Sequence, residues 1–394
     1  MRRLQSPRRT YDWGSREEIP DFLGQPVDGE RVAEVWLGTH ALAPSLVDGP
    51  DGPRSLLEVS GELPFMLKIL AADRPLSLQV HPDAELARAG FDAEEASGTP
   101  LDAPHRVFKD PHPKPEMVLA LTTFDTLVGF RPTAEILRVL GALPTSLTQK
   151  LAERLRAEPG FAGIVALVEQ LVTDPPTPQE VGDVVAACAD GVQRRTDVKR
   201  AYLTALEVNE HHAGDVGVVI SLLLNRLTLQ PGEAAYLATG IIHAHLKGMC
   251  LEVMVSSDNV LRAGLTSKHL DPQGLVRCVS GGMSRLARVE PEQFGESTDV
   301  FSPGLREFAL SMTQVSPAEP AGTPLPDQGR RIIVCTGGEV ELVNEHDERL
   351  PLRRGSAVYA DAADGTIRAH GTGEVGQAYT PTAEDRATPL TDLV

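Results

Sequence analysis

Apolar and polar residues alternate along the stretch PLSLQVHPD, residues 75–83. Because successive side chains of a β-strand point to opposite faces, two leucines and a valine share one face of this segment. The other face carries Ser77, Gln79 and His81. The pattern predicts a strand whose polar face contains an amide and an imidazole, and we expect this face to line the inside of a barrel while the apolar face packs outward.

Short apolar runs separated by turn-forming residues continue through the first 131 residues, for example over 65–70 and 117–130. They favour a β-rich, turn-rich structure. The chain is also rich in the two residues that form turns, with 35 glycines and 31 prolines.

From residue 132 to about 205 the period of the apolar residues becomes helical. Ile164, Leu167, Val168 and Leu171 fall at the spacing i, i+3, i+4 and i+7, which places them on one face of a helix. A helix start follows at TPQE, where Thr177 is an N-cap and the glutamate three residues later can close a capping box.

Strand patterns return after this helical part, and the nearly apolar run VGVVISLLLNRLTL (216–229) predicts a strand buried on both faces. We therefore expect a mainly β protein. Residues 1–131 and 206–289 would form one β-barrel, 132–205 a helical insertion, and 290–394 a second, C-terminal β domain.

Composition limits the classes of partner. The formal net charge of -18 argues against a general affinity for nucleic acid or an anionic membrane. The four cysteines are scattered without a CxxC pair, which is typical of a reducing compartment, and the basic N-terminus is not followed by a secretory hydrophobic segment. We expect a cytoplasmic monomer.

Three stretches supply side chains of the kind that bind metals. The first is Gln79 with His81, the second is HPKPEM with Glu116, and the third is ATGIIHAHLKGMCLE with His243 and His245. A zinc site needs about four nitrogen, oxygen or sulfur donors. Each stretch alone indicates little, because a single histidine on a strand is more often hydrogen-bonded or exposed than bound to a metal.

Taken together, these stretches resemble one family. LSLQVHPD, KPEM and LEVMVSSDNVLRAGLTSKHLD are similar to the type I phosphomannose isomerases, zinc-dependent cupin enzymes that interconvert mannose 6-phosphate and fructose 6-phosphate. YDWGS and AEVWLGTH resemble the N-terminal region of the same family, so the resemblance extends over about residues 10–275. It implies cupin-type jelly-roll barrels, one catalytic and one C-terminal, with an inserted helical domain.

The resemblance also implies one zinc ion per chain, with Gln79, His81, Glu116 and His243 as its ligands. The family usually has a tyrosine two residues after its last histidine ligand, and His245 occupies that place here. The choice between the two histidines is therefore open, and we favour His243.

Aldose–ketose isomerisation moves a proton between C1 and C2 through an enediolate, so negative charge develops on the sugar oxygens. A divalent cation with one carboxylate among its ligands keeps a net charge of about +1 and can stabilise that charge. Arg262 stands at the position of the family's catalytic arginine and would act electrostatically, because it cannot serve as a base near neutral pH. Glu252 would be the proton shuttle or a ligand of a sugar hydroxyl.

The substrate's phosphate group needs a cradle of cations or hydroxyl groups. We expect Ser77, Lys114 and Lys268 to bind this small-molecule sugar phosphate. Two alternatives remain: another metal-dependent cupin, such as an oxygenase or an isomerase of a different sugar phosphate, and a sugar-binding cupin without catalysis. The Gln-x-His sequence, where iron cupins have His-x-His, disfavours the oxygenase.

Overall fold

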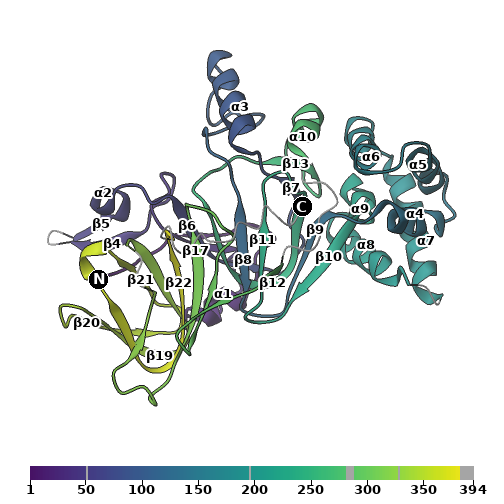
Figure 1. The fold of residues 1–394 in the computed structure, drawn as a ribbon. Helices are drawn as coiled ribbons and strands as arrows, with labels where there is room; N and C mark the ends of the chain where they lie inside the picture. The colour runs from purple at the N-terminus through teal and green to yellow at the C-terminus, as the bar shows by residue number, and fades with distance from the viewer. Residues whose placement is uncertain (50–51, 195–196, 281–287, 327–328, 382–394) are drawn as a thin grey trace.

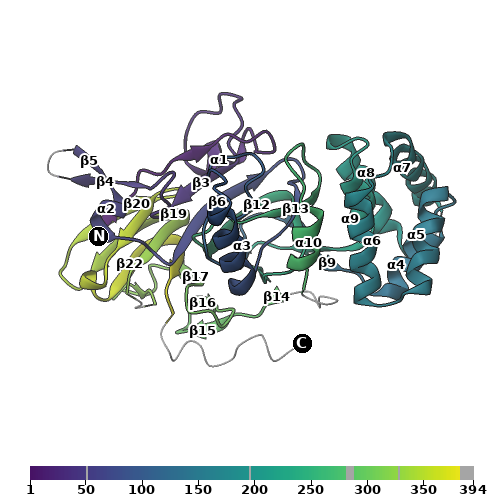
Figure 2. The same ribbon diagram turned by 90° about the horizontal axis from the view of Figure 1, so that it is seen from above.

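A computed structural model describes residues 1–49, 52–194, 197–280, 288–326 and 329–381 of the chain. Figure 1 shows three bodies in a row: a C-terminal β structure, a central β structure and a group of helices. Figure 2, seen from above, shows the same order. In the described part of the chain no helix combines the length and the apolar character needed to cross a membrane.

The central body is a barrel, called here the central barrel. Among the described residues its sheet has eleven strands. They are β2 (Arg8–Arg9), β3 (Glu34–Leu37), β6 (Phe65–Ala72), β7 (Leu78–Val80), β8 (Glu116–Ala120), β9 (Phe124–Phe130), β10 (Leu224–Leu229), β11 (Ala234–Leu237), β12 (His243–Val255), β13 (Leu261–Gly264) and β14 (Arg288–Val289).

Strand β12 closes the central barrel because it belongs to two layers. Its first half, His243 to Lys247, pairs with β7 and β9, and its second half, from Gly248 to Val255, pairs with β6 and β8. Gly248 lies where the strand passes from one layer to the other, with a φ of 108°. A side chain on this residue would lie 2.3 Å from the carbonyl oxygen of Thr123, so only glycine fits the corner.

Strand β7 is shorter than the alternating pattern predicts. The ladder covers Leu78–Val80 and leaves Leu76 and His81 outside it. Leu78 and Val80 join the hydrophobic cluster that contains the insertion helices, which confirms that they pack outward beneath those helices. Leu76 instead contacts a different cluster, in the barrel interior.

Helices form the third body, here called the helical segment. They are α4 (Thr133–Gly141), α5 (Ser146–Ala157), α6 (Phe161–Thr173), α7 (Pro178–Gln193), α8 (Lys199–His211) and α9 (Val216–Ser221). The predicted capping box at Thr177 is confirmed, since both of its hydrogen bonds are present. The strand predicted over 216–221 is wrong: these residues form α9, and the side chain of Asp215 caps its start. Helices thus extend past residue 205.

The C-terminal body, called here the C-terminal barrel, has nine strands among the described residues. They are β1 (Arg2–Arg3), β15 (Glu292–Phe294), β16 (Thr298–Phe301), β17 (Ala309–Val315), β18 (Thr323–Pro324), β19 (Arg331–Asn344), β20 (Arg349–Arg353), β21 (Ala357–Ala360) and β22 (Ile367–Tyr379). Strand β1 pairs with β21, so the first residues of the chain join this barrel and not the central one. Residues 382–394, the end of the predicted C-terminal domain, lie outside the described residues.

Smaller elements surround these bodies. They are the hairpin β4 (Leu46–Gly49) and β5 (Gly52–Ser55), the helices α1 (Glu18–Phe22), α2 (Leu56–Ser60), α3 (Ala84–Ala96) and α10 (Pro272–Cys278), and the short 3-10 helix η1 (Ala362–Asp364). Helix α3 follows β7 and stands at the edge of the central barrel in Figure 1.

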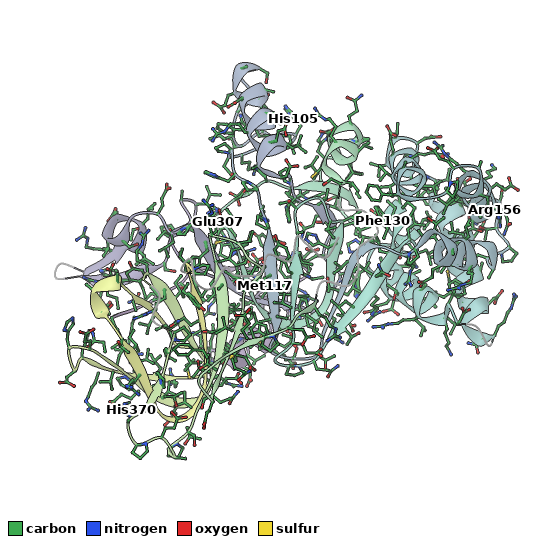
Figure 3. The ribbon with its side chains drawn as sticks, in the orientation of Figure 1. His105, Met117, Phe130, Arg156, Glu307 and His370 are labelled. Atoms are coloured by element: carbon green, nitrogen blue, oxygen red, sulfur yellow. The ribbon has the colours of Figure 1, made fainter. Side chains whose placement is uncertain are left out.

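The two barrels pack face to face through strands that alternate strictly. Val118 and Cys250 point into the central barrel, whereas their neighbours Met117 and Leu251 join a cluster shared with Leu310 of the C-terminal barrel. Figure 3 labels Met117 at this junction. The mainly β fold with two cupin-type barrels and inserted helices is confirmed.

A glycine lies where the two barrels pack against each other. A side chain on Gly376 of β22 would lie 2.5 Å from the Cδ1 atom of Leu251 on β12. This distance is too short for two non-bonded carbon atoms, so a larger residue here would force the side chain of Leu251 to move.

Candidate metal centre and active site

Three neighbouring strands bring predicted site residues side by side. In the register of the sheet, Gln79 of β7 is the partner of both His243 on β12 and Arg262 on β13. Directly opposed residues in antiparallel strands project from the same face with their Cβ atoms about 5 Å apart. The ladder therefore places the amide between an imidazole and a guanidinium.

Two histidines and a glutamate converge in the interior of the central barrel. The Nε2 atom of His81 lies 3.4 Å from Oε1 of Glu116, and Nε2 of His243 lies 3.3 Å from Oε2 of the same carboxylate. One ligand atom from each residue lies within 4.8 Å of the others, as a metal site requires. All three side chains are at most 2% exposed.

The atoms that face one another in this cluster lack ordinary partners. His81 Nε2, His243 Nε2 and Glu116 Oε2 are buried and make no hydrogen bond within the described residues. Buried polar atoms are almost always satisfied, so three unsatisfied atoms aimed at one point indicate a site that can hold a cation. Nitrogen and oxygen donors of this kind fit zinc.

The opposite ring nitrogens fix the histidines in the form that binds a metal. Nδ1 of His81 donates to the carbonyl of Asn259 at 2.7 Å, and Nδ1 of His243 donates to the carbonyl of Ile241 at 3.0 Å. A carbonyl can only accept, so Nδ1 carries the proton and each neutral ring presents its Nε2 lone pair to the cluster.

Charge in the cluster is balanced for a cation. Burial lowers the pKa of His81 to about 4, which keeps the ring neutral near pH 7. Burial alone would raise the pKa of Glu116, but the side chains of His81 and Lys114 hold it well below its ordinary value. Lys114 Nζ lies 3.2 Å from Glu116 Oε1. The glutamate is therefore an anion next to the neutral ring of His81 and the ammonium of Lys114.

His245 is engaged elsewhere. Its Nε2 lies 3.1 Å from Oε1 of Glu252, and its Nδ1 lies 3.1 Å from the hydroxyl of Thr126. With both ring nitrogens occupied, His245 has no lone pair to offer a metal. The contacts favour His243 over His245 as the ligand.

Glu252 belongs to a buried row of charged side chains in the central barrel. Its Oε2 accepts from Nζ of Lys68 at 2.9 Å, and the same ammonium lies 3.2 Å from Oε1 of Glu34. Burial would raise the pKa of Glu252, but the Lys68 ammonium holds it at about 2. Burial would likewise lower the pKa of Lys68, but Glu252 and Glu34 raise it well above its ordinary value. Glu252 is thus a permanent anion near neutral pH.

Cations gather at the mouth of the barrel. The guanidinium of Arg262 is partly buried and makes no hydrogen bond or ion pair with any described residue. Lys268, six residues further along, is exposed. Burial and then the charges of Arg262 and Lys109 lower the pKa of Lys268, whereas Asp12 raises it, so both of these cations act on Lys268. An anion placed among them would relieve their repulsion.

Ser77 lies just before β7 and is partly buried, and within the described residues its hydroxyl makes no hydrogen bond. It stands two residues before Gln79, on the segment that leads into the ladder.

Two residues matter in this site beyond what the sequence assigned to them: the sequence predicts Lys68 on a strand near the barrel mouth without a role, and Asn259 as a brace of the turn that presents Arg262. Lys68 is one: the signal for it was a charged residue in the middle of the apolar run FMLKIL of β6. Asn259 is the other, and its side chain and backbone bind several parts of the site (see below). The sequence predicts the bracing of the turn before Arg262, but not the bonds of Asn259 to the 109–112 loop and to His81.

Known proteins are similar to this chain in both sequence and fold. A model of the phosphomannose isomerase type I catalytic domain matches residues 1–133. The mannose-6-phosphate isomerase of Escherichia coli K12 is 32% identical over 406 residues, which span 96% of this chain and 99% of that protein. The human mannose-6-phosphate isomerase is 27% identical and spans 89% of this chain and 91% of its own length.

Solved structures agree. A zinc-bound mannose 6-phosphate isomerase superposes with a TM-score of 0.86 at 30% identity, covering 97% of this chain and 99% of that one. A histidine-to-alanine mutant of phosphomannose isomerase from Salmonella typhimurium gives a TM-score of 0.87 at 30% identity, covering 97% and 100%. With near-complete coverage on both sides, the resemblance carried by the short motifs is confirmed, and the chain belongs to the type I phosphomannose isomerase family.

Proposed function

We propose that this chain is a zinc-dependent mannose-6-phosphate isomerase, which interconverts mannose 6-phosphate and fructose 6-phosphate. The observation that carries the proposal is the convergence of three unsatisfied buried atoms, on His81, Glu116 and His243, inside a barrel whose relatives are named for this activity. Gln79 is the fourth proposed ligand, because the ladder sets it opposite His243. We expect one zinc ion per chain.

The bound zinc would supply a positive charge that stabilises the negative charge developing on the sugar oxygens. Arg262 supports the same charge from the side, because it lies opposite Gln79 and its guanidinium is free to donate. We propose Arg262 as the catalytic arginine. Its lowered pKa still leaves it protonated near pH 7, so it stabilises charge and does not move a proton.

Ser77, Lys114 and Lys268 are the proposed binding residues for the sugar phosphate. Lys268 belongs to the cation group at the barrel mouth, where a dianionic phosphate would find complementary charge. Lys114 lies deeper, against Glu116, and would contact sugar oxygens near the metal. Ser77 adds a hydroxyl on the face of Gln79.

The contacts of Glu252 favour a supporting role over that of a proton shuttle. Both of its oxygens accept hydrogen bonds, and its pKa of about 2 makes it a weak base. Glu252 instead fixes the ammonium of Lys68 inside the barrel. Since an ammonium has three donors and two are used by Glu252 and Glu34, one remains for a ligand.

Finer features of this function are also proposals. All four cysteines are buried thiols without disulfides, which supports a cytoplasmic location. The net charge of -18 supports a small-molecule partner over nucleic acid or an anionic membrane surface. We propose that the enzyme acts as a monomer, because each chain carries the whole proposed site.

Metal analysis combined with an isomerase assay tests the proposal against another metal-dependent cupin and a non-catalytic sugar binder. Formation of fructose 6-phosphate is measured by a coupled assay, in which fructose 6-phosphate is converted to glucose 6-phosphate and the oxidation of glucose 6-phosphate is recorded. We expect about one zinc per chain, activity lost on chelation, and recovery when zinc is restored. Full zinc occupancy without turnover of mannose 6-phosphate would contradict the isomerase and favour the binder.

A further inference from the structure

Asn259 is fully buried in the turn between β12 and β13, and its side chain uses all of its hydrogen-bonding capacity. Its Oδ1 accepts from the backbone N–H of Lys109 at 2.7 Å and, at 3.3 Å, from that of Asp110. Its Nδ2 donates to the carbonyls of Asp110 at 2.7 Å and His112 at 2.9 Å. One amide thus holds the loop 109–112 from both sides.

The backbone of Asn259 is bound as tightly as its side chain. Its carbonyl is the group that accepts from Nδ1 of His81 at 2.7 Å, and its N–H donates to the hydroxyl of Ser257 at 3.2 Å. That hydroxyl in turn donates to Oδ2 of Asp110 at 3.1 Å. The turn and the loop are therefore connected by several bonds that share Asn259.

Three segments of the proposed site meet at this residue. The loop 109–112 leads directly into Lys114 and Glu116, the turn leads into Arg262, and His81 follows β7. Because no strand ladder of the described residues pairs the 109–112 loop with β7, the register of the sheet does not by itself fix His81 relative to the loop that precedes Glu116.

We propose that Asn259 is the positioning residue of the zinc centre: its side chain fixes the loop before Glu116, and through that bond it holds the carbonyl that orients His81. The inference rests on the proposed ligand set. Removing the amide would leave the carbonyl bound only through the backbone and the start of the β13 ladder, so the direction of His81 would be less firmly fixed. Outer partners of metal ligands typically contribute about 10- to 100-fold to metal affinity.

The test is the affinity of the full-length Asn259→Ala variant for zinc, measured by competition with a chromophoric chelator. We expect a loss of about 10- to 100-fold relative to wild type, with the fold retained by circular dichroism. Zinc alone is the ligand in this experiment, so isomerase activity is a separate readout. If the wild-type protein bound no zinc, the proposed function would fail. If the wild-type protein bound zinc and the variant bound it with the same affinity, the inference alone would fail.

The C-terminal barrel offers a matched control. Asn344 is 5% exposed, its Oδ1 accepts from the N–H groups of His346 at 3.0 Å and Glu348 at 2.9 Å, and its Nδ2 donates to Glu348 and Asp364. Asn344→Ala removes a comparable set of bonds from a comparable turn. We expect it to lower the unfolding midpoint about as much as Asn259→Ala while leaving zinc affinity unchanged.

Equal zinc affinity in the two variants would overturn the inference, because general destabilisation would then explain everything. Should Asn259→Ala fail to fold, Ser257→Ala decides the question with a smaller perturbation. It removes the hydroxyl that connects the Asn259 N–H to Asp110 and also reaches the carbonyl of His112 at 3.4 Å. We expect a measurable loss of zinc affinity of a few-fold, smaller than the typical effect of a metal ligand's direct partner, and an unchanged affinity would overturn the proposal.

Discussion

The central barrel and the C-terminal barrel are built from similar strands but are filled by different side chains. The core of the C-terminal barrel is a cluster of aliphatic residues that includes Ile333, Val358 and Ile367. The central barrel has such a cluster in only part of its interior. The remainder holds ionisable side chains, among them Glu116 and Lys68, both almost completely buried.

Burying charges is costly unless each has a partner. In the buried chain of Glu34, Lys68 and Glu252 the charges satisfy one another, since the ammonium of Lys68 lies between the two carboxylates. In the metal cluster the polar atoms do not satisfy one another, since Nε2 of His81 and Nε2 of His243 remain without a hydrogen bond. The difference teaches that polarity alone does not mark the functional end of a barrel. The mark is a group of unsatisfied buried atoms that converge on one point, because single unsatisfied atoms such as Oε1 of Gln377 also occur in the C-terminal barrel.

The histidines of the two barrels make the same point. Those of the C-terminal barrel lie away from a cluster of ligands: His346 contacts the backbone carbonyl of Ala363 at 2.9 Å. Figure 3 labels His370 at the end of this barrel remote from the helical segment. Replacing either should leave zinc in place, which makes them useful controls.

The largest effect is expected from removing a proposed ligand. His81→Ala takes away one of the three donors whose lone pairs converge, so zinc and isomerase activity should both be lost, by more than the roughly hundredfold typical of outer partners. Metal content by mass spectrometry and the coupled assay check this. His370→Ala is the control, and stoichiometric zinc in the His81 variant would refute the ligand assignment.

A large loss of stability should follow when the buried ion pairs of Lys68 are broken. Lys68→Met leaves Glu34 and Glu252 buried without their cation, and removal of one partner of a buried pair typically costs about 3–5 kcal/mol. Denaturant unfolding followed by fluorescence measures the change. Adding Glu252→Gln to this variant should restore part of the stability, and no recovery would mean that the two charges do not depend on each other.

Arg262→Ala tests the group that would stabilise charge in the transition state. We expect kcat to fall about 10²- to 10³-fold while zinc content and fold remain, since removing one such donor has this effect. Arg353→Ala on the exposed surface of the C-terminal barrel should change nothing in the assay. A rise in KM without a fall in kcat would move Arg262 from catalysis to phosphate binding.

Local patterns predicted the parts of this molecule that depend on neighbours in sequence. Alternation placed Gln79 and His81 inside the barrel, and the capping box at Thr177 has both of its expected bonds. The motifs, through the family they resemble, identified residues such as Glu116, which the fold brings to His81 and His243.

What failed depended on contacts between distant segments. The apolar run 216–221 is surrounded by core on all sides, and a fully buried run has no period that separates helix from strand. Strand β1 joins β21 across more than 350 positions, a pairing that no short pattern encodes. The same holds for Lys68, whose role depends on a register that aligns it with Glu252 on β12.

Lys268→Ala should have a more moderate effect than Arg262→Ala, and of a different kind. A charge-assisted bond to phosphate exists in both the bound substrate and the transition state, so its loss should raise KM about tenfold and change kcat less. Steady-state kinetics with mannose 6-phosphate separate the two constants. If both variants raised KM alone, the cations at the mouth would form one phosphate clamp without a catalytic member.

The smallest effect is expected in the apolar cluster of the C-terminal barrel. Ile333 of β19 is fully buried in the C-terminal barrel, and Ile333→Val removes one methylene group from a close-packed core. Such a change typically costs about 0.5–1.5 kcal/mol, because the neighbours relax only partly around the space left. The unfolding midpoint should fall slightly while zinc affinity, kcat and KM stay at wild-type values.

The C-terminal barrel contacts the central barrel through Leu310 and Ile332, not through Ile333. A loss of zinc or of kcat in this variant would therefore show that the two interiors are mechanically coupled, and the division between a stabilising barrel and a reactive one would have to be given up.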